Sequence, residues 1–401
     1  MFGDTWLHLT ALLLLIGALS DHTEITVLGI LIFFTDGLTR LWSFLSFRGV
    51  SYEHRFSVGR AFHDEVIDVE MEVSNRKALP LLWVEVNELV PEELPLAGAN
   101  LMTSHIPKML LLARTTSVAA HDRVKWRYEL TCAKRGYYRL GPASIRSGDL
   151  FGVLPRQQEV GHSRPLLVYP KMAPLPELTF PQRRPFGDVR SNQRIFEDPS
   201  RIIGVRDYHP TDPLNRVDWK ATARSQSLQV KQFEPSTTLH LLILLNIDTL
   251  DHSWEGYIPE LLEQAVSGAA SVARYAFEHR WAVGLMANGT FPYSEYPIRI
   301  PSSRNPSQLI HILEALAGTM PLTTSTLVEL IEEESHRFPW GATIACVAAK
   351  VTEELWGELA RLKQRGHPVT LLNVSGRRIE SPIPGIDVVE LPETPAFSGT
   401  K

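Results

Sequence analysis

The sequence predicts a multidomain α+β protein with an N-terminal transmembrane helical hairpin, an antiparallel β-sandwich and a doubly wound α/β domain. Two apolar stretches lie close together before residue 48, and residues then alternate with a period of two to about residue 170. Apolar runs alternate with segments of helical period after that. We place the domains at residues 1–48 (hairpin), 49–170 (sandwich), 171–235 (linker and charged segment), 236–380 (α/β domain) and 381–401 (C-terminal tail).

The composition excludes several classes of protein. A chain of 401 residues is long enough for two or three domains. The net charge of −5 gives no global attraction to nucleic acid, so we expect no nucleic-acid partner. The two cysteines, Cys132 and Cys346, are far apart and form no CxxC motif, which argues against a disulfide scaffold or a zinc ribbon. We expect no cofactor.

The hairpin prediction rests on two apolar stretches, residues 6–19 and 25–47, joined by the polar residues 20–24. Crossing a bilayer takes about 20 apolar residues, which the second stretch reaches easily and the first only from its very start. A cleaved signal peptide is the alternative for the first stretch. No Lys or Arg precedes Leu7 and a second span follows at once, so we favour an anchored hairpin.

The charges around the hairpin predict its orientation. The turn carries Asp21 and Glu24 and no basic residue. Arginines gather at the end of the second span and beyond it: Arg40, Arg48, Arg55 and Arg60. The positive-inside rule therefore places both termini and the soluble domains on the cytoplasmic side of the inner or plasma membrane. Asp36, inside the second span, is a functional candidate by default, but a place near the interface is the favoured explanation.

The residues after the hairpin read as short strands. Residues 66–73 alternate apolar and charged side chains, and the pattern resumes at 81–86, 124–130 and 136–140. Short alternating strands separated by turn residues are typical of an antiparallel sandwich. We expect this module to present a surface or support its neighbour rather than to carry out chemistry.

A dense charged segment follows a proline- and arginine-rich linker at residues 170–199. Lys220 and Arg224 are expected on one side of a short helix. Trp219 and Tyr208 stand among the charges, which predicts that part of the segment is buried and that its charges are paired. The candidate site residues are Arg206, Asp207, Tyr208, Asp212, Arg216, Asp218, Trp219, Lys220, Arg224, Lys231 and Glu234.

Three interpretations of this segment stay open. Arginine–carboxylate pairs can hold the loop rigid or bind a partner's acidic group, which is the interpretation we favour. Alternatively, Asp207, His209, Asp212 and Asp218 form a metal or acid–base site of a hydrolase. The third interpretation is a solvated loop.

The string GVRDYHPTDPLNRVDWKATARSQSLQVKQFE, residues 204–234, resembles the signature of the bacterial "domain of unknown function 58" family. We call these residues the signature segment. Upstream pieces also resemble the family, including Arg135-Gly136-Tyr137-Tyr138 and the run from Gly148 to Gly152. Thr211 departs from the glycine that many relatives carry.

The last part of the chain predicts a parallel sheet with crossover helices. Strands are expected at residues 239–245, 281–286, 343–348 and 368–374, with helices at 259–279, 306–316, 326–338 and 352–365. No glycine-rich phosphate loop opens any of these helices, so nucleotide binding has no support.

The family resemblance implies that this part is similar to a von Willebrand factor type A domain, many of which bind Mg²⁺ through D-x-S-x-S, a threonine and an aspartate. The corresponding stretch is Asn246-Ile247-Asp248-Thr249-Leu250, and starting from Asp248 places Leu250 and His252 where serines are needed. Thr326 is a candidate for the threonine, but Ala348-Ala349-Lys350 lacks the aspartate. We therefore expect no tight Mg²⁺ site.

We interpret the chain as a membrane-anchored interaction or adaptor protein and not an enzyme. The resemblance implies a MoxR-type AAA+ ATPase as its partner, and the client is not identified by the sequence. A metal-dependent membrane-bound hydrolase is the alternative. A third possibility is a structural anchor in which the signature segment only rigidifies the domain junction.

Overall fold

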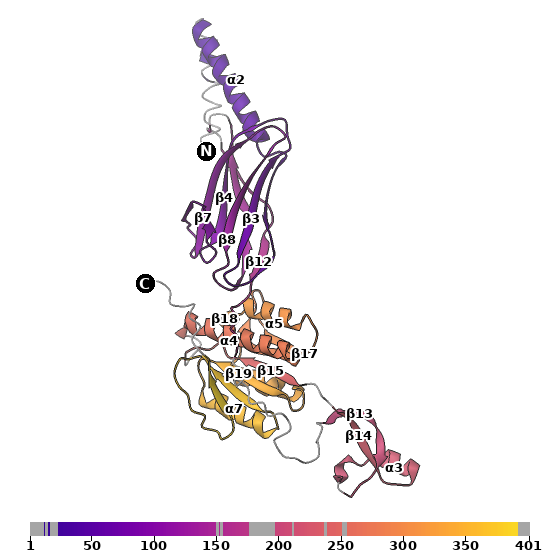
Figure 1. The fold of residues 1–401 in the computed structure, drawn as a ribbon. Coiled ribbons are helices and arrows are strands. Elements are labelled where there is room, and N and C mark those ends of the chain that lie inside the picture. The colour runs from indigo at the N-terminus through magenta and orange to yellow at the C-terminus, as the bar shows by residue number, and fades with distance from the viewer. Residues whose placement is uncertain are drawn as a thin grey trace. The chain divides into compact units, whose positions relative to one another are not determined.

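The computed structural model describes residues 23–149, 155–175, 197–210, 212–235, 239–250 and 255–391, together with residues 12, 15, 16 and 152. The chain divides into two compact units, residues 1–169 and 170–401. Each unit is described by itself below, with the element labels of Figure 1.

The first unit begins with helix α2 (Thr23–Leu45). Its residues Thr26–Leu45 are long and apolar enough to cross a membrane, and only 11% of that stretch is buried, so α2 is not a core helix. The structure therefore describes a single helix of this kind where the sequence predicts a hairpin. The predicted first arm, residues 6–19, lies outside the described residues except for Leu12, Leu15 and Ile16.

Two charged residues within α2 pair with each other. The Nε atom of Arg40 donates a hydrogen bond of 2.8 Å to Oδ2 of Asp36, one helical turn earlier. An ion pair at this i, i+4 spacing reduces the cost of placing two charges in an apolar helix. The pairing gives Asp36 a structural role in α2.

Helix α2 continues into the first strand through a short ordered turn. Gly49 has a φ of +71°, which a residue with a side chain rarely adopts. The backbone N–H of Val50 donates to the carbonyl of Phe47, and the Nζ atom of Lys77 donates to the carbonyls of Leu45 and Ser46. Burial lowers the pKa of Lys77 to about 8.

The strands that follow α2 form mostly antiparallel sheets around one core, as the period-two pattern predicts (Figure 1). A four-stranded sheet has the order β1 (Val50–Phe56), β3 (Val66–Asn75), β8 (Arg123–Thr131), β5 (Leu96–Ala97). A five-stranded sheet has the order β11 (Arg156–Val160), β10 (Ala143–Ser147), β4 (Leu81–Pro91), β7 (Met109–Val118), β6 (Leu101–Thr103). A third sheet has the order β2 (Arg60–Ala61), β12 (Arg164–Val168), β9 (Gly136–Leu140).

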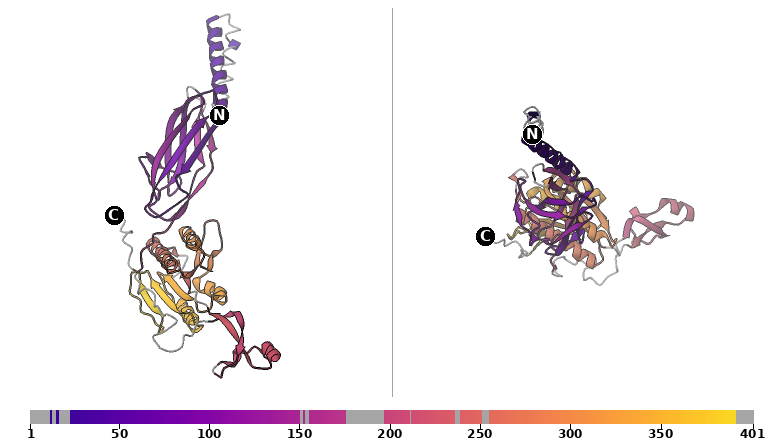
Figure 2. Two further views of the ribbon diagram at one scale, coloured as in Figure 1. Left: turned by 45° about the vertical axis from the view of Figure 1, so that its right-hand side comes forward. Right: turned by 90° about the horizontal axis from the view of Figure 1, so that it is seen from above.

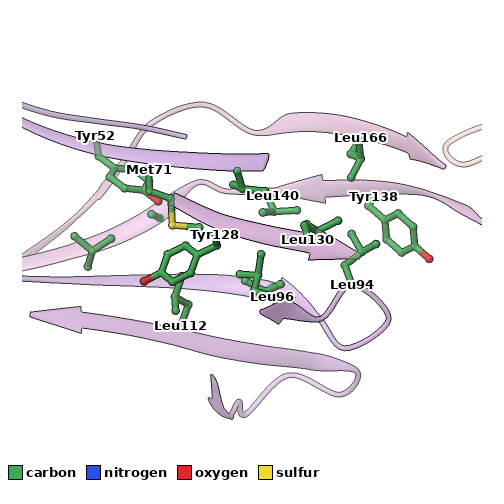
Figure 3. Close-up of a cluster of buried hydrophobic side chains, with 14 of the residues drawn as sticks. Tyr52, Met71, Leu94, Leu96, Leu112, Tyr128, Leu130, Tyr138, Leu140 and Leu166 are labelled. Carbon is green, nitrogen blue, oxygen red and sulfur yellow. The ribbon is translucent and has the colours of Figure 1, made fainter. Parts of the chain in front are cut away.

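The core of this unit comes from the inward positions of several strands. In β3, every second residue from Ile67 to Asn75 is buried, because successive side chains of a strand point to opposite faces. Figure 3 shows Met71 of β3 beside Tyr128 of β8, and Leu130 of β8 close to Leu140 of β9. Burial of these apolar side chains is the main source of stability for the unit.

The second unit contains a mostly parallel sheet of seven strands. Its order is β17 (Pro297–Ser303), β16 (Ala282–Thr290), β15 (His240–Leu245), β19 (Thr343–Ala348), β20 (Val369–Asn373), β21 (Asp387–Glu390), and β18 (Met320–Thr323) also pairs with β16. Strands β17 and β18 run antiparallel to β16, whereas the other neighbours are parallel. The sheet continues to Glu390, beyond the predicted domain boundary at residue 380.

Helices cover both faces of this sheet, which is the doubly wound arrangement. Helices α6 (Leu327–Glu334) and α7 (Glu353–Gln364) share one apolar cluster with Leu242 and Leu244 of β15. Helix α4 (Pro259–Glu278) lies against the other face, where an added Cβ at Gly268 would come within 3.3 Å of Val347. Helix α5 (Gln308–Ala317) packs beside α4. The predicted strands and helices are thus largely confirmed, while β17, β18 and β21 were not predicted.

Candidate functional site: the signature segment and the strand-end cluster

The signature segment folds into a two-stranded ribbon that carries a short helix (Figure 2). Strand β13 (Glu197–Asp207) pairs antiparallel with β14 (Gln229–Pro235), and a 3₁₀ turn, η2 (Leu214–Arg216), leads into helix α3 (Trp219–Ser225). Residues 197–199, predicted as linker, belong to β13.

The loop after β13 is held by an arginine–carboxylate pair. Two hydrogen bonds, of 2.6 and 2.7 Å, join the guanidinium of Arg206 to both carboxylate oxygens of Asp212. The backbone N–H of His209 donates to the same carboxylate at 2.9 Å. The hydrogen bonds from Arg206 and then His209 lower the pKa of Asp212 to about 2. This is the bidentate pairing that the favoured interpretation of the sequence proposes.

Asp218 caps helix α3. Its Oδ1 atom accepts hydrogen bonds of 3.0 Å from the backbone N–H groups of Lys220 and Ala221, which otherwise have no partner within the helix. These bonds, that of Ala221 first, lower the pKa of Asp218. The N–H of Asp218 also donates to the carbonyl of Gln229 at 2.8 Å, so the cap ties α3 to β14.

The base of the segment contains its few buried groups. Val217 and Val230 are buried and form a β-bridge. The side-chain amide of Gln229, also buried, donates to Oδ1 of Asp207. The backbone N–H of Tyr208 donates to the carbonyl of Leu228. The polar contacts thus fix the path of the chain around a very small apolar centre.

Part of the segment is buried, as predicted, at Val217, Gln229 and Val230, but Trp219, one of the two residues that suggested it, is 69% exposed. A helix of seven residues on a two-stranded ribbon is too small to bury an indole. Leu214 is 66% exposed nearby, whereas Tyr208 is half-buried as expected. The segment therefore presents apolar side chains outward from a polar frame.

The remaining predicted residues are spread over the ribbon and its helix. Lys220 and Arg224 lie four residues apart in α3, as predicted, and are exposed. Arg216 in η2 and Lys231 in β14 are partly buried. Glu234 belongs to β14, opposite Asp198, and its side chain lies outside the described residues.

The geometry does not favour the proposed acid–base site, because each of its three carboxylates already accepts a hydrogen bond from a neighbouring group. Asp212 is held by Arg206, Asp218 by the start of α3, and Asp207 by Gln229. Across the described residues, no three His, Cys, Asp or Glu side chains are grouped so that they could hold a metal ion. The segment instead exposes the indole of Trp219 and the cationic side chains of Lys220 and Arg224 on an ordered helix.

A second polar cluster lies where strands β15 and β16 end. Asn288, fully buried, donates from Nδ2 to Oδ1 of Asn246 at 3.1 Å and to Oδ2 of Asp248 at 2.8 Å. Its own Oδ1 accepts from the N–H of Ile247. Asn246 also donates to the carbonyl of Lys350, after β19, at 3.2 Å. Burial raises the pKa of Asp248.

These residues do not fit a Mg²⁺ ion. A hard cation needs converging oxygen ligands, but the amide nitrogen of Asn288 points at the carboxylate of Asp248. Leu250 supplies no ligand oxygen. The hydroxyl of Thr326 accepts the backbone N–H of Glu329 at 3.2 Å, and the Glu329 carboxylate accepts the N–H of Thr326 at 2.9 Å, so Thr326 caps α6 in a capping box.

A third cluster, missed by the sequence reasoning, lies inside the first unit. Tyr52 and His54 of β1 are 2% exposed and Glu88 of β4 is fully buried. The hydroxyl of Tyr52 donates to Oε2 of Glu88, and Nδ1 of His54 lies 3.1 Å from Oε1. Burial, with Glu88 next in importance, raises the pKa of Tyr52. Glu88 could have been found because it falls in phase with the inward residues Val84, Val86 and Val90.

A family match is centred on the signature segment and the α/β sheet. Residues 204–396 match the family described as "Protein of unknown function DUF58". This match supports membership of the DUF58 family. A curated relative, the uncharacterised protein YeaD of Bacillus subtilis (strain 168), is 27% identical over 173 residues, which is 42% of this chain and 41% of the relative. The chain therefore matches less than half the length of this relative.

Solved structures resemble this chain only distantly. The CARDB domain of a Pyrococcus furiosus protein has a TM-score of 0.20 at 12% identity, covering 30% of this chain and 86% of its own. A cohesin module from a Clostridium perfringens glycoside hydrolase has a TM-score of 0.21 at 7% identity, covering 30% of this chain and 97% of its own. At such scores these likenesses carry no argument about function.

Proposed function

We propose that the protein is a membrane-anchored interaction protein whose signature segment binds a MoxR-type AAA+ ATPase. Helix α2 serves as the anchor, and the arginines that follow it support a cytoplasmic position of the soluble units under the positive-inside rule. The parallel sheet with helices on both faces is a von Willebrand factor type A-like domain that lacks the metal site. The choice of partner comes from the family resemblance.

The observation that carries the proposal is the exposure of Trp219 on an ordered frame. The side chain is 69% exposed, although α3 is capped by Asp218 and the preceding loop is held by Arg206 and Asp212. Tryptophan is among the residues most enriched in the energetic centres of protein interfaces. A fixed frame also lowers the entropy lost when a partner binds.

The chemistry of α3 suggests what the partner surface carries. The helix, WKATARS, contains Lys220 and Arg224 and no acidic residue, and both cations are exposed. A matching surface therefore has an apolar pocket for the indole with carboxylates at its rim. Leu214, exposed in the preceding turn, adds apolar area.

The proposal is tested with the full-length protein in nanodiscs and the purified MoxR-type ATPase encoded in the same genome. Loss of an interface tryptophan costs about 2 kcal/mol or more, so Trp219→Ala is expected to weaken binding about thirtyfold or more. Trp340→Ala is the matched control, because Trp340 is 62% exposed and lies in the linker before β19.

Two results would count against the proposal. If the wild type and Trp219→Ala bind the ATPase with equal affinity, the signature segment is not the binding surface. A lowered melting temperature of Trp219→Ala without a binding defect would instead favour the purely structural role.

A further inference from the structure

We propose that the cytoplasmic end of helix α2 carries a binding site for the phosphate group of an anionic phospholipid. The inference rests on the proposed anchoring of α2. The site comprises Phe44, Phe47 and Arg48 at the helix end and Arg156, Gln157 and Gln158 of β11, which surround a pocket of about 420 Å³.

Two guanidinium groups from distant parts of the chain meet at one aromatic ring. The Cζ atom of Arg48 lies 4.7 Å from the centroid of Phe44, and that of Arg156 lies 5.4 Å from the same centroid. Stacking on a ring holds a guanidinium in place while its N–H groups stay available at its edge. Phe44 is 49% exposed, so this arrangement opens to the surroundings.

The charge of the pocket is unbalanced. The described residues that line it include two arginines and no carboxylate. Within the described residues, neither Arg48 nor Arg156 forms an ion pair with an acidic side chain, whereas Arg40 pairs with Asp36 and Arg206 with Asp212. Two such guanidiniums match a phosphate diester, which accepts hydrogen bonds from planar donors.

The position of the pocket at the end of the proposed membrane helix favours a lipid phosphate over a soluble phosphate as the ligand. Helix α2 ends at Leu45, so Phe44 and Arg48 lie where a membrane helix meets the headgroup layer. Leu41, 54% exposed, and Gly37 lie one and two turns before Phe44 on the same helix face. Among the residues that the structure describes, an added Cβ at Gly37 would meet nothing within 4 Å, so no described side chain blocks an acyl chain on this face of α2.

Lys77 does not belong to this site, although it lies close to the same helix end. Its Nζ atom is committed to the carbonyls of Leu45 and Ser46. It fixes the end of α2 to the sandwich, so Phe44 and Arg156 keep their places. The lipid contact is therefore assigned to the two stacked arginines.

The test measures which lipids stay bound to the full-length protein. The protein is extracted from vesicles of equal parts phosphatidylglycerol and phosphatidylcholine, and native mass spectrometry counts the retained lipids. The wild type is expected to retain phosphatidylglycerol in preference. Each of Arg48→Gln and Arg156→Gln is expected to lower that preference about fivefold, from about 1 kcal/mol per basic residue near a membrane surface.

Arg139→Gln is the matched control, because Arg139 stacks on Tyr137 at 5.4 Å in β9 and lies outside the pocket. Retention of the full preference by the Arg48→Gln/Arg156→Gln double variant would overturn the proposal. Equal loss in Arg139→Gln would also overturn it, because the effect would then follow net charge. Elution of the bound lipid by inorganic phosphate alone would reassign the site to a free anion.

A separate measurement keeps the anchoring and the lipid site apart. Carbonate extraction of the wild type from pure phosphatidylcholine vesicles tests the anchor, because insertion of α2 does not need an anionic lipid. Release by carbonate would contradict the anchor, whereas resistance combined with no lipid preference would contradict only the phosphate site.

Discussion

Arg206 and Asp212 are six residues apart and face each other through two hydrogen bonds of 2.6 and 2.7 Å. The pair holds the loop between β13 and η2 in place. Both oxygens of the Asp212 carboxylate, one of the groups that the hydrolase hypothesis needs, accept hydrogen bonds from Arg206. The pair also leaves the neighbouring apolar side chains on the outside. These contacts favour a structural role for the pair, in which it supports an exposed surface, over an acid–base role for Asp212.

The first prediction concerns this pair at low pH. The pKa of Asp212 is lowered from 3.8 to about 2 in the folded chain, so its contribution to stability is complete above pH 3.8 and is lost as the pH falls through about 2. A carboxyl titration by ¹³C NMR is expected to show Asp212 ionised at pH 3. In an Arg206→Gln variant the midpoint should rise towards 3.8, and an unchanged midpoint would contradict the pairing.

The second prediction concerns the buried cluster of the first unit. Tyr52→Phe removes the hydroxyl that donates to the buried carboxylate of Glu88, and loss of such a bond costs about 1–3 kcal/mol. The free energy of unfolding, followed by hydrogen exchange in β1 and β4, should fall by that amount. Tyr128→Phe is the control, since Tyr128 is buried in the same cluster and forms no hydrogen bond with Glu88 in the described chain. Equal losses in both variants would mean that Glu88 does not depend on Tyr52.

The third prediction separates a helix cap from a metal ligand. Thr326→Ala should destabilise α6 by about 1 kcal/mol through loss of its cap, to the same extent with Mg²⁺ or with a chelator. Thr326→Ser should restore the stability, because serine is an equally good cap. Thermal unfolding measures both. A loss that appears only when Mg²⁺ is present would show that Thr326 is a ligand after all.

The fourth prediction concerns the ion pair within α2. Asp36→Lys replaces the carboxylate that Arg40 pairs with by a second cation, so the helix should insert less well, because two like charges four residues apart repel each other and each is costly in the bilayer. Replacing both residues by leucine should restore insertion. The fraction of protein that resists carbonate extraction measures this. A single variant that inserts as well as the wild type would place the pair outside the apolar layer.

Much of the fold could be predicted because strand and helix periods are local properties of the chain. The alternation at residues 66–73 became β3, and the apolar run at 239–245 became β15. Strand β17 was missed because Pro297 and Pro301 argue against a strand, yet at the edge of a sheet they are tolerated.

The sites were less predictable because they depend on packing between distant residues. Trp219 and Tyr208 stand among charged residues, which predicted that part of the segment is buried, but the small size of its surroundings leaves Trp219 itself exposed. Asn288 was missed because the predicted strand ended at Met286, four residues before β16 ends at Thr290. The pairing of Arg206 with Asp212 was predictable as a type of contact, though not as these two partners.

The short turn between α2 and β1 has a mechanical consequence. Gly49 adopts the left-handed conformation and Lys77 donates to the helix end. The sandwich is therefore joined to the proposed anchor by a short hydrogen-bonded turn and not by a long linker. Any change in the tilt of α2, such as one caused by a thinner bilayer, would swing the sandwich through a similar angle. The protein could thus convert membrane thickness into the direction in which its first unit points.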